Sequence, residues 1–365
     1  MANKLKLGLV GADADGRGWG PAAHIPALHE IEQIELVALC TSRPESAAAA
    51  AEAFGVDRAY HNVNELVAQP DIDIVSAVVN IPSHYEVVMP ALNAGKHVYC
   101  EWPLGASLAE TEEMAALAHA KDVVTAIGLQ GRHDPSLTYI KELCDEGWLG
   151  DIHSVQMTFL GTSTPDRPSR AEYEREVHRG AHLMTIIGGH TLDYVAYCFG
   201  SLAEVSARVT TRVKKLRMVD TGEMVDAEAA DNVLINGVLT NGALLSYQLS
   251  AVPFHGDGWR MAVYGSKGTI IATAQGLPQI TPIKLVGAQG DEPLVELPIP
   301  ERLRLVPASV PSGPPQNVGQ AYVRMAEAIQ EGEPFAPSFE DALEAHKLLD
   351  AIQQSSDEGR VIKLV

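Results

Sequence analysis

The chain has 365 residues, of which 46% are hydrophobic and 20% charged, which predicts about two packed domains and excludes a disordered protein. Its 47 carboxylates outnumber its 27 lysines and arginines, and this net charge of −20 argues against nucleic-acid and anionic-membrane partners. With no membrane-length apolar run and no signal-peptide pattern at the N-terminus, we expect a cytoplasmic protein. Four scattered cysteines without metal-clip spacing predict reduced thiols and no metal site.

Short apolar runs alternate with helix-like stretches over the first 130 residues. Such runs are typical of strands buried on both faces, and their alternation with helices indicates βαβ units around a parallel sheet. A Ser107/Glu110 pair forms a capping-box pattern at the start of one helix. The predicted strands are 5–10, 34–40, 72–79, 97–100 and 123–127, and the predicted helices are 44–54, 83–94 and 107–120.

The sequence pattern changes after residue 128, where apolar and polar residues alternate as in strands, without regular helices between the strands. This pattern predicts an α/β chain with two domains: an N-terminal domain around a parallel sheet (1–130) and a C-terminal α/β domain (131–365) with an open, mostly antiparallel sheet. In the second domain we expect strands at 152–160, 233–239, 243–250, 260–264 and 361–365, helices at 135–146, 183–199, 321–330 and 339–354, and loops at 162–180 and 307–315.

A glycine cluster follows the first strand, from Gly11 to Gly20. A dinucleotide fold binds pyrophosphate at this place, because glycine lets backbone amides approach the phosphates. Strict GxGxxG spacing puts Asp13 at the middle glycine, so an ordinary glycine-rich turn remains an alternative. After the second strand, Ser42 and Arg43 stand where NAD sites carry an acid, which favours the 2′-phosphate of NADP.

Several motifs resemble, in order, those of the glucose–fructose oxidoreductase/inositol dehydrogenase/MocA family. Residues 94–104, AGKHVYCEWPL, resemble its AGKHVxCEKPL signature, and residues 24–28, HIPAL, resemble its HxPAL motif. Residues 81–84, 128–135, 188–193 and 265–269 resemble its proline–histidine loop and its GxNxRxxP, GxHxxD and G(S/T)xGT motifs. The resemblance implies a Rossmann domain, a second α/β domain, NAD or NADP as cofactor, and sugars, polyols or related substrates.

Aligning the HIPAL motif places Gly20 at the family's third glycine, with residues inserted in the turn. The insertion and several motifs are similar to the galactose regulatory corepressor of yeast, a branch in which nucleotide binding persists and enzymatic chemistry need not. On this resemblance the expected cofactor-binding residues are Gly11, Ala12, Gly18, Trp19, Gly20, Ser42, Arg43, Asn80, Ile81, His84, Glu101, Trp102 and Gln130.

The family's dehydrogenases place a Lys, an Asp and a His around the reacting hydroxyl. At the matching positions this chain has Trp102, Ile186 and His190, so only the histidine remains able to move a proton. With an ordinary pKa of about 6.5, His190 would serve as the general acid/base. The alternative is a structural histidine that hydrogen-bonds Asp193 one helical turn away.

Other polar residues gather just before His190 in the sequence. As a group they are predicted to bind a polyhydroxylated or anionic ligand, although each alone would suit a solvated loop. His182 and Tyr173 are the next candidates for the catalytic base, whereas Arg132 would contact a ligand carboxylate or cap a domain interface. The expected substrate-binding residues are Arg132, His178, Arg179 and Asp193.

Two functions fit these residues. The first is an NAD(P)-dependent oxidoreductase acting on a carbohydrate-like substrate, in a variant of which transient oxidation enables an elimination without net redox. The second is a non-catalytic nucleotide sensor that regulates a protein partner. In either case we expect a homodimer or larger homo-oligomer, because the open sheet should expose an apolar face that another copy covers.

Overall fold

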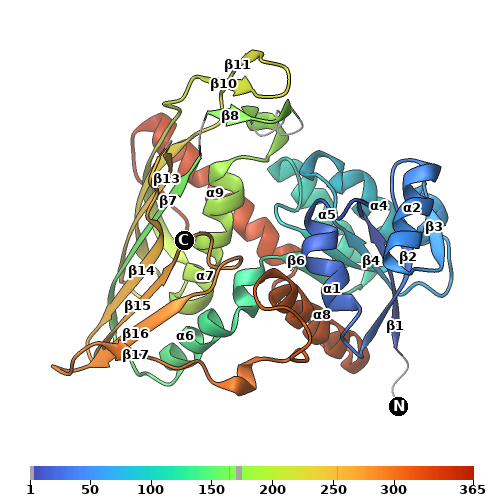
Figure 1. The fold of residues 1–365 in the computed structure, drawn as a ribbon. Helices are drawn as coiled ribbons and strands as arrows, with labels where there is room; N and C mark the ends of the chain where they lie inside the picture. Colours follow the sequence, from blue (N-terminus) through green and yellow to red (C-terminus); the bar gives the residue numbers. More distant parts are fainter. Residues whose placement is uncertain (1–3, 164, 170–174, 253) are drawn as a thin grey trace. The chain divides into compact units, whose positions relative to one another are not determined.

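The computed structural model describes residues 4–163, 165–169, 175–252 and 254–365 (Figure 1). The chain divides into two compact units. The first unit contains the chain up to His133 together with Arg304–Glu344, and the second contains Asp134–Leu303 and Ala345–Val365. The sequence pattern did not reveal that residues 304–344 belong to the first unit, and a domain boundary near residue 130 remains a proposal.

The first unit is built on a six-stranded parallel sheet with strand order β3-β2-β1-β4-β5-β6, which confirms the predicted Rossmann fold. The short strand β3 escaped prediction because three residues are too few to form an apolar run. The strands are β1 (Leu5–Val10), β2 (Ile34–Cys40), β3 (Arg58–Tyr60), β4 (Ile74–Ala77), β5 (His97–Glu101) and β6 (Thr125–Gly128).

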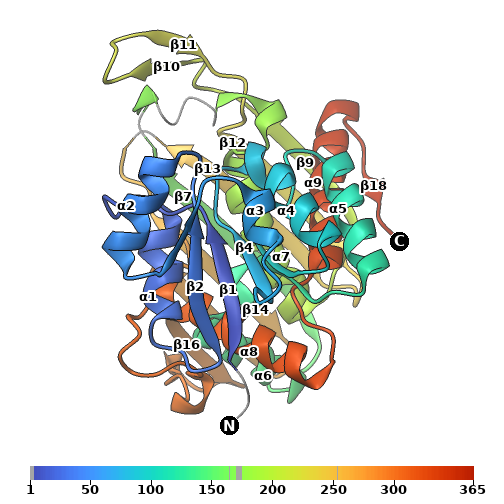
Figure 2. The same cartoon turned by 90° about the vertical axis from the view of Figure 1, so that its right-hand side faces the viewer.

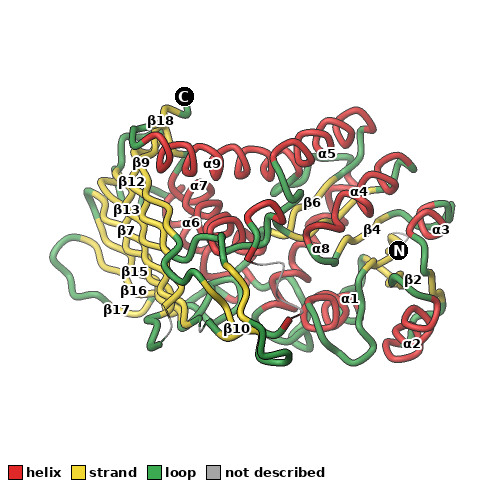
Figure 3. The backbone as a smooth tube through the Cα atoms, turned by 90° about the horizontal axis from the view of Figure 1, so that it is seen from above, coloured by secondary structure: helices red, strands yellow, loops and turns green. Residues whose placement is uncertain are grey.

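Helices cover both faces of this sheet, which is why its strands are continuously apolar. Helices α1, α2 and α8 lie on one face and α3, α4 and α5 on the other (Figure 3). Ser107 caps α5 by accepting from the backbone N–H of Glu110, as predicted, while the Glu110 carboxylate accepts from the N–H of Ala106. The helices are α1 (Ile25–Leu28), α2 (Pro44–Phe54), α3 (Val63–Val67), α4 (His84–Asn93), α5 (Leu108–Lys121) and α8 (Pro314–Glu331).

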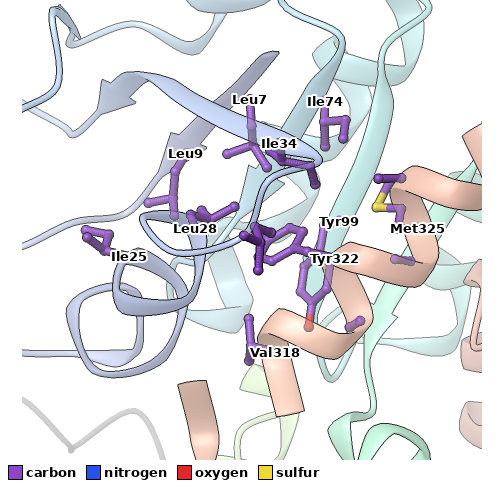
Figure 4. Close-up of a cluster of buried hydrophobic side chains, with 14 of the residues drawn as sticks. Leu7, Leu9, Ile25, Leu28, Ile34, Ile74, Tyr99, Val318, Tyr322 and Met325 are labelled. Atoms are coloured by element: carbon purple, nitrogen blue, oxygen red, sulfur yellow. The ribbon is translucent and has the colours of Figure 1, made fainter. Parts of the chain in front are cut away.

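Helix α8 brings the late part of the chain into the first unit. Its buried side chains Val318, Tyr322 and Met325 join the core cluster that contains Leu7 and Ile74 from the parallel strands (Figure 4). The helix begins seven residues earlier than predicted, because Pro314 and Pro315 occupy its first turn, where proline is tolerated. This apolar face gives residues 304–344 a physical reason to pack within the first unit.

The second unit contains a nine-stranded sheet in which β7 and β13 pair in parallel and the other neighbours are antiparallel, as predicted. Helices α6 (Pro135–Asp145), α7 (Gly189–Phe199) and the second-unit part of α9 (Phe339–Glu358) lie along one face (Figures 1 and 2). The strands of this sheet are β7 (Ile152–Thr162), β9 (Leu202–Thr210), β12 (Asn232–Leu239), β13 (Leu244–Val252), β14 (Gly258–Gly265), β15 (Gly268–Ala274), β16 (Lys284–Gln289), β17 (Val295–Glu296) and β18 (Ile362–Lys363).

A small second sheet accounts for part of the predicted loop 162–180. It joins β8 (Asp166–Arg167) to β10 (Lys215–Met218) and β11 (Met224–Asp226). Strands of two to four residues give too little alternation for prediction from sequence. Residues 177–179 of the same segment form a single 3₁₀ turn.

The other face of the nine-stranded sheet is more polar than the sequence suggested. Its exposed side chains include Gln156, Ser206 and Asn236, with the leucines Leu234 and Leu244 interspersed. Apolar exposure is therefore scattered, and a homo-oligomer through this face remains a prediction. Among the described residues, no helix is both long and apolar enough to cross a membrane.

Buried histidines make the stability depend on pH. Burial lowers the pKa of His133 to about 3 and the pKa values of His182 and His346 to about 4, so each stays neutral in the folded protein. The unfolded chain takes up these protons below about pH 6.5, so the free energy of unfolding falls as the pH falls.

Urea unfolding should therefore show a loss of about 2 kcal/mol per buried histidine between about pH 7 and pH 5. His133→Leu removes one of the protons taken up on unfolding. The dependence of the free energy of unfolding on pH should therefore become less steep, whatever the absolute stability of the variant. An unchanged slope would contradict the neutral, buried state of His133.

Candidate functional site

The glycine turn after β1 has an inner part that packs tightly on the neighbouring strands. Gly11 has a φ of +108°, and its N–H donates to the carbonyl of Cys40 at 3.0 Å. A Cβ on Gly11 would lie 2.1 Å from the Val78 carbonyl oxygen. Glycine is thus required at this position by the approach of two backbones, in addition to any approach to a phosphate.

The outer part of the turn is open. Gly16 and Gly18 have positive φ values, and a Cβ on either would meet nothing within 4 Å. Arg17 pairs with Asp13 at 3.1 Å and with Asp15 at 2.7 Å, which offsets both carboxylates of the inserted segment. This balance limits the repulsion that these acids would exert on an anion at the turn.

A helical stretch begins where the turn ends, with a π-helical turn over Gly20–His24 that continues into α1. No side chain caps its N-terminus, and the open backbone at Gly16 and Gly18 lies just before it in the chain. An uncapped helix start preceded by open glycines is the arrangement that accepts a pyrophosphate. These residues therefore fit a dinucleotide.

The segment after β2 is organised by its own side chains. Thr41 Oγ1 lies 2.6 Å from Ser46 Oγ and 3.2 Å from the Arg43 carbonyl oxygen, which fixes the entry into α2. Ser42 and Arg43 are exposed, and within the described chain no ion pair engages Arg43. This leaves a guanidinium available at the place where a 2′-phosphate would lie.

A largely buried hydrogen-bond network connects five elements of the first unit. His24 Nε2 lies 2.9 Å from Glu101 Oε1, and Gln130 Nε2 donates to Glu101 Oε2 at 2.7 Å. On the other side of the imidazole, Nδ1 lies 2.7 Å from the Tyr322 hydroxyl, which lies 2.8 Å from Ser76 Oγ. Because a carboxylate only accepts, His24 donates to Glu101 from Nε2, and its Nδ1 is left to interact with the Tyr322 hydroxyl.

A second buried histidine connects the loops after β4 and β5. His84 Nε2 lies 3.0 Å from the Val79 carbonyl oxygen, and Nδ1 lies 2.8 Å from that of Pro103. Burial lowers the pKa of His84, although the two carbonyls favour the charged ring. The ring thus positions the loop that carries the buried Trp102.

All the predicted cofactor residues lie at the carboxyl edge of the parallel sheet, where open α/β folds bind their ligands. Ala12 and Ile81 are buried, Asn80 is exposed, and both carboxylate oxygens of Glu101 are held by protein groups. The turn after β1 carries Gly11, Ala12, Gly18, Trp19 and Gly20; Ser42 and Arg43 follow β2; Asn80, Ile81 and His84 follow β4; Glu101 and Trp102 end β5; and Gln130 follows β6.

In the second unit, His190 lies where a π-helical turn (Met184–Gly188) continues into α7, and His182 lies two residues before that turn. Such turns are frequent at functional sites. His190 and Asp193 are both buried on this helix. Thr191 Oγ1 lies 2.8 Å from the Tyr247 hydroxyl on β13, which fixes the helix to the sheet directly beside His190.

Several predicted substrate residues lie elsewhere. Arg132 belongs to the first unit, where it pairs with Asp341 at 2.9 Å. His178 and Arg179 are exposed, and their Nε2 and Nε atoms lie 3.6 and 2.6 Å from Oε2 of Glu176. Neither residue lines the pocket of the second unit that contains His182. Tyr173 lies outside the described residues.

That pocket brings together residues that sequence reasoning missed. Arg167 and Arg175 line it together with His182, Ile186 and Asp231. Both arginines lie within the segment expected to be a polar loop, and no spacing distinguished them from solvated charges. The abundance of arginine in that segment was the only signal available.

Comparison with known proteins gives matches along most of the chain. Residues 5–129 match the family described as "Oxidoreductase family, NAD-binding Rossmann fold", and residues 135–274 match "Gal80p, C-terminal domain". The myo-inositol 2-dehydrogenase of Thermotoga maritima is 29% identical over 363 residues, which is 99% of this chain and 98% of that protein.

Two further relatives align over a smaller part of their length. The dehydrogenase aclE of Aspergillus oryzae is 32% identical over 60% of this chain and 62% of its own. The galactose/lactose metabolism regulatory protein GAL80 of Saccharomyces cerevisiae is 30% identical over 66% of this chain and 59% of its own. A super-repressor mutant of that yeast protein has the same fold, with a TM-score of 0.87, 24% identity and coverage of 99% and 98% of the two chains.

The buried network predicts a stability effect. Tyr322→Phe removes the hydroxyl between His24 and Ser76 and should lower the free energy of unfolding of the first unit by about 1–3 kcal/mol, because two buried polar groups lose their partner. Denaturant unfolding measures this loss. Tyr85→Phe, which removes a surface hydrogen bond to Glu113, is the matched control with a much smaller effect. Equal losses in the two variants would contradict the importance of the network.

Proposed function

The chain belongs to the glucose–fructose oxidoreductase/inositol dehydrogenase/MocA family of oxidoreductases with an NAD-binding Rossmann fold, and we propose that it is an NAD(P)-dependent oxidoreductase of a sugar, polyol or glycoside-like substrate. The observation that carries this proposal is the open glycine turn at the carboxyl edge of the parallel sheet. Gly16 and Gly18 leave its backbone exposed directly before an uncapped helix start. A protein that had lost its nucleotide would have no need of this arrangement.

We propose NADP as the preferred cofactor. The exposed Arg43, at the N-cap of α2, would bind the 2′-phosphate, with the Ser42 hydroxyl as a second donor. Gly11 and Gly20 would allow the inner part of the turn to pack tightly. The loops that carry Asn80, Ile81 and Trp102 would form the nicotinamide side of the binding site. The role of Glu101, Gln130 and His84 would be to position these loops, since their polar atoms are engaged by protein groups.

Proton transfer would rest on His190. A bound nicotinamide nucleotide would supply the hydride acceptor or donor. Oxidation of an alcohol also needs a group that removes the hydroxyl proton, and neither the Trp102 indole nor Ile186 can do so. His190 would accept this proton, with His182 as the second candidate in the neighbouring pocket.

The same residues would also support an elimination. Oxidation of a sugar carbon to a ketone acidifies the adjacent C–H, so that a glycosidic or ether substituent can leave after the proton is removed. Return of the hydride would then restore the nucleotide, with no net redox. A glycoside substrate would give this outcome and a free polyol would give simple oxidation.

A regulatory function is the second candidate. The match of residues 135–274 to the Gal80p C-terminal domain and the loss of the Lys and Asp positions favour a nucleotide sensor that binds a protein partner. Turnover separates the two candidates. No turnover across a panel of sugars, polyols and glycosides with either cofactor, together with a partner captured only when nucleotide is present, would favour the sensor.

The cofactor assignment predicts a selective loss. Arg43→Ala should weaken NADP binding about tenfold or more while changing NAD binding little, because only NADP carries the phosphate that the guanidinium would bind. Calorimetric titration of both nucleotides measures the difference. Arg260→Ala, at an exposed position on β14, is the control. Equal losses for NAD and NADP at Arg43 would rule out the 2′-phosphate contact.

The catalytic assignment predicts a large kinetic effect. His190→Ala should lower kcat about 10²–10⁴-fold, as for a lost general base, and leave nucleotide affinity unchanged. His153→Ala, at an exposed position on β7, should change neither quantity. Steady-state rates with a turned-over polyol provide the measurement. A fully active His190→Ala enzyme would transfer the role to His182.

A further inference from the structure

The most informative feature of the second unit is the pocket that contains His182, next to the π-helical turn Met184–Gly188 that precedes α7. Its volume is about 280 Å³, which suits a ligand of monosaccharide size. His182 and Ile186 line it, and a hydrogen bond of 2.8 Å from the N–H of Ile186 to the carbonyl of His182 makes this one helical turn. His190 follows four residues later, on α7, and is not among the described residues that line the pocket.

Two guanidinium groups line the same pocket. Arg167 donates to the Asp166 carbonyl oxygen at 3.0 Å and to the Ser163 hydroxyl, and its charge helps to lower the pKa of the Asp166 carboxyl. Arg175 donates to the Asp226 carbonyl oxygen at 3.1 Å and pairs with Glu176 at 3.0 Å. Their backbone contacts anchor both guanidinium groups beside the pocket, so little side-chain entropy is lost when they bind a ligand.

Asp231, a carboxylate in the lining, is already hydrogen-bonded to other protein groups. Asp231 accepts backbone N–H groups from Arg212 at 2.8 Å and Val213 at 2.6 Å, and the Asn232 side chain at 3.0 Å. Its oxygens therefore hold the backbone of the segment just before β10. The pocket thus presents donors that are charged and an acceptor that is already occupied.

His182 supplies a neutral polar group. Its side chain is 9% exposed, and Nδ1 has no hydrogen-bond partner within the described part of the chain. Burial lowers its pKa to about 4, so the ring is neutral near pH 7. Its free nitrogen can then donate a hydrogen bond to a hydroxyl or accept one from it. A buried polar atom without a partner costs stability, and a ligand hydroxyl would satisfy it.

From these groups we infer that the pocket binds a carboxylated sugar or polyol, with the carboxylate on Arg167 and Arg175 and a hydroxyl on His182. The remaining walls, which include Leu183, Ile186 and Ile187, are apolar and suit the carbon face of such a ligand. The inference rests on the proposed function, because it names the substrate class of the proposed oxidoreductase. It adds a requirement for negative charge that the redox chemistry itself does not impose.

Calorimetric titration of the full chain, saturated with NADP, tests this inference without relying on turnover. The probes are D-glucuronate, D-galacturonate and D-gluconate, each compared with its neutral counterpart glucose, galactose or glucitol. At least one acid should bind about tenfold or more tightly than its neutral counterpart, and added salt should reduce the difference.

Variants assign the effect to the pocket. Arg167→Gln and Arg175→Gln should each remove most of the preference for the acid, and Arg167→Lys should keep part of it because the charge remains. Arg260→Gln, at an exposed position outside this pocket, is the matched control and should change nothing.

Equal affinity for acids and neutral sugars, binding of none of the six probes, or an acid preference that survives both glutamine variants would each overturn the inference. Binding of neutral sugars with turnover would then leave the oxidoreductase proposal standing. Acid-selective binding that depends on the two arginines, without any turnover, would support the pocket and contradict the proposed function.

Discussion

The carboxylate of Glu101 is held from two sides inside the first unit, by the imidazole of His24 and by the amide of Gln130. Tyr322 closes this network from helix α8, which comes from the last fifth of the chain. A buried carboxylate is stable only when its oxygens are satisfied, so these residues depend on one another. The network fixes the ends of β5 and β6 and the helix after the glycine turn, which together form the carboxyl edge where a dinucleotide would bind.

This constraint explains why the nucleotide side can persist while the chemical side changes. Trp102 directly follows Glu101, so the backbone at the position of the family's lysine is held by the network whatever side chain it carries. Trp102 in place of that lysine, and Ile186 in place of the family's aspartate, leave this scaffold intact. Under the proposed function, the proton chemistry would depend on the histidines near α7, and substrate selection would depend on the arginines of the adjoining pocket.

Sequence alone predicted the parts of the molecule that follow from apolar periodicity. The strands at 5–10 and 34–40 matched the structure residue for residue, because buried parallel strands are continuously apolar. Strands β3 and β8 were missed because two or three residues carry no period. The partnership of His24 with Tyr322 joins residues 298 positions apart, and no local pattern encodes such a contact. For the same reason the sequence did not single out Arg167 and Arg175 as pocket residues, because their proximity depends on the fold of the small second sheet.

Hydride transfer is the central claim, and isotope transfer tests it most directly. The protein would be mixed with oxidised NADP and a sugar acid or polyol carrying deuterium on its alcohol carbons, and the nucleotide would be examined by mass spectrometry. We predict that one deuterium appears on the nicotinamide ring, because these substrates carry no glycosidic substituent and their oxidation ends at the carbonyl compound without return of the hydride. Nucleotide that stays unlabelled while both ligands are shown to bind would contradict the account and leave a protein that senses its nucleotide without using it.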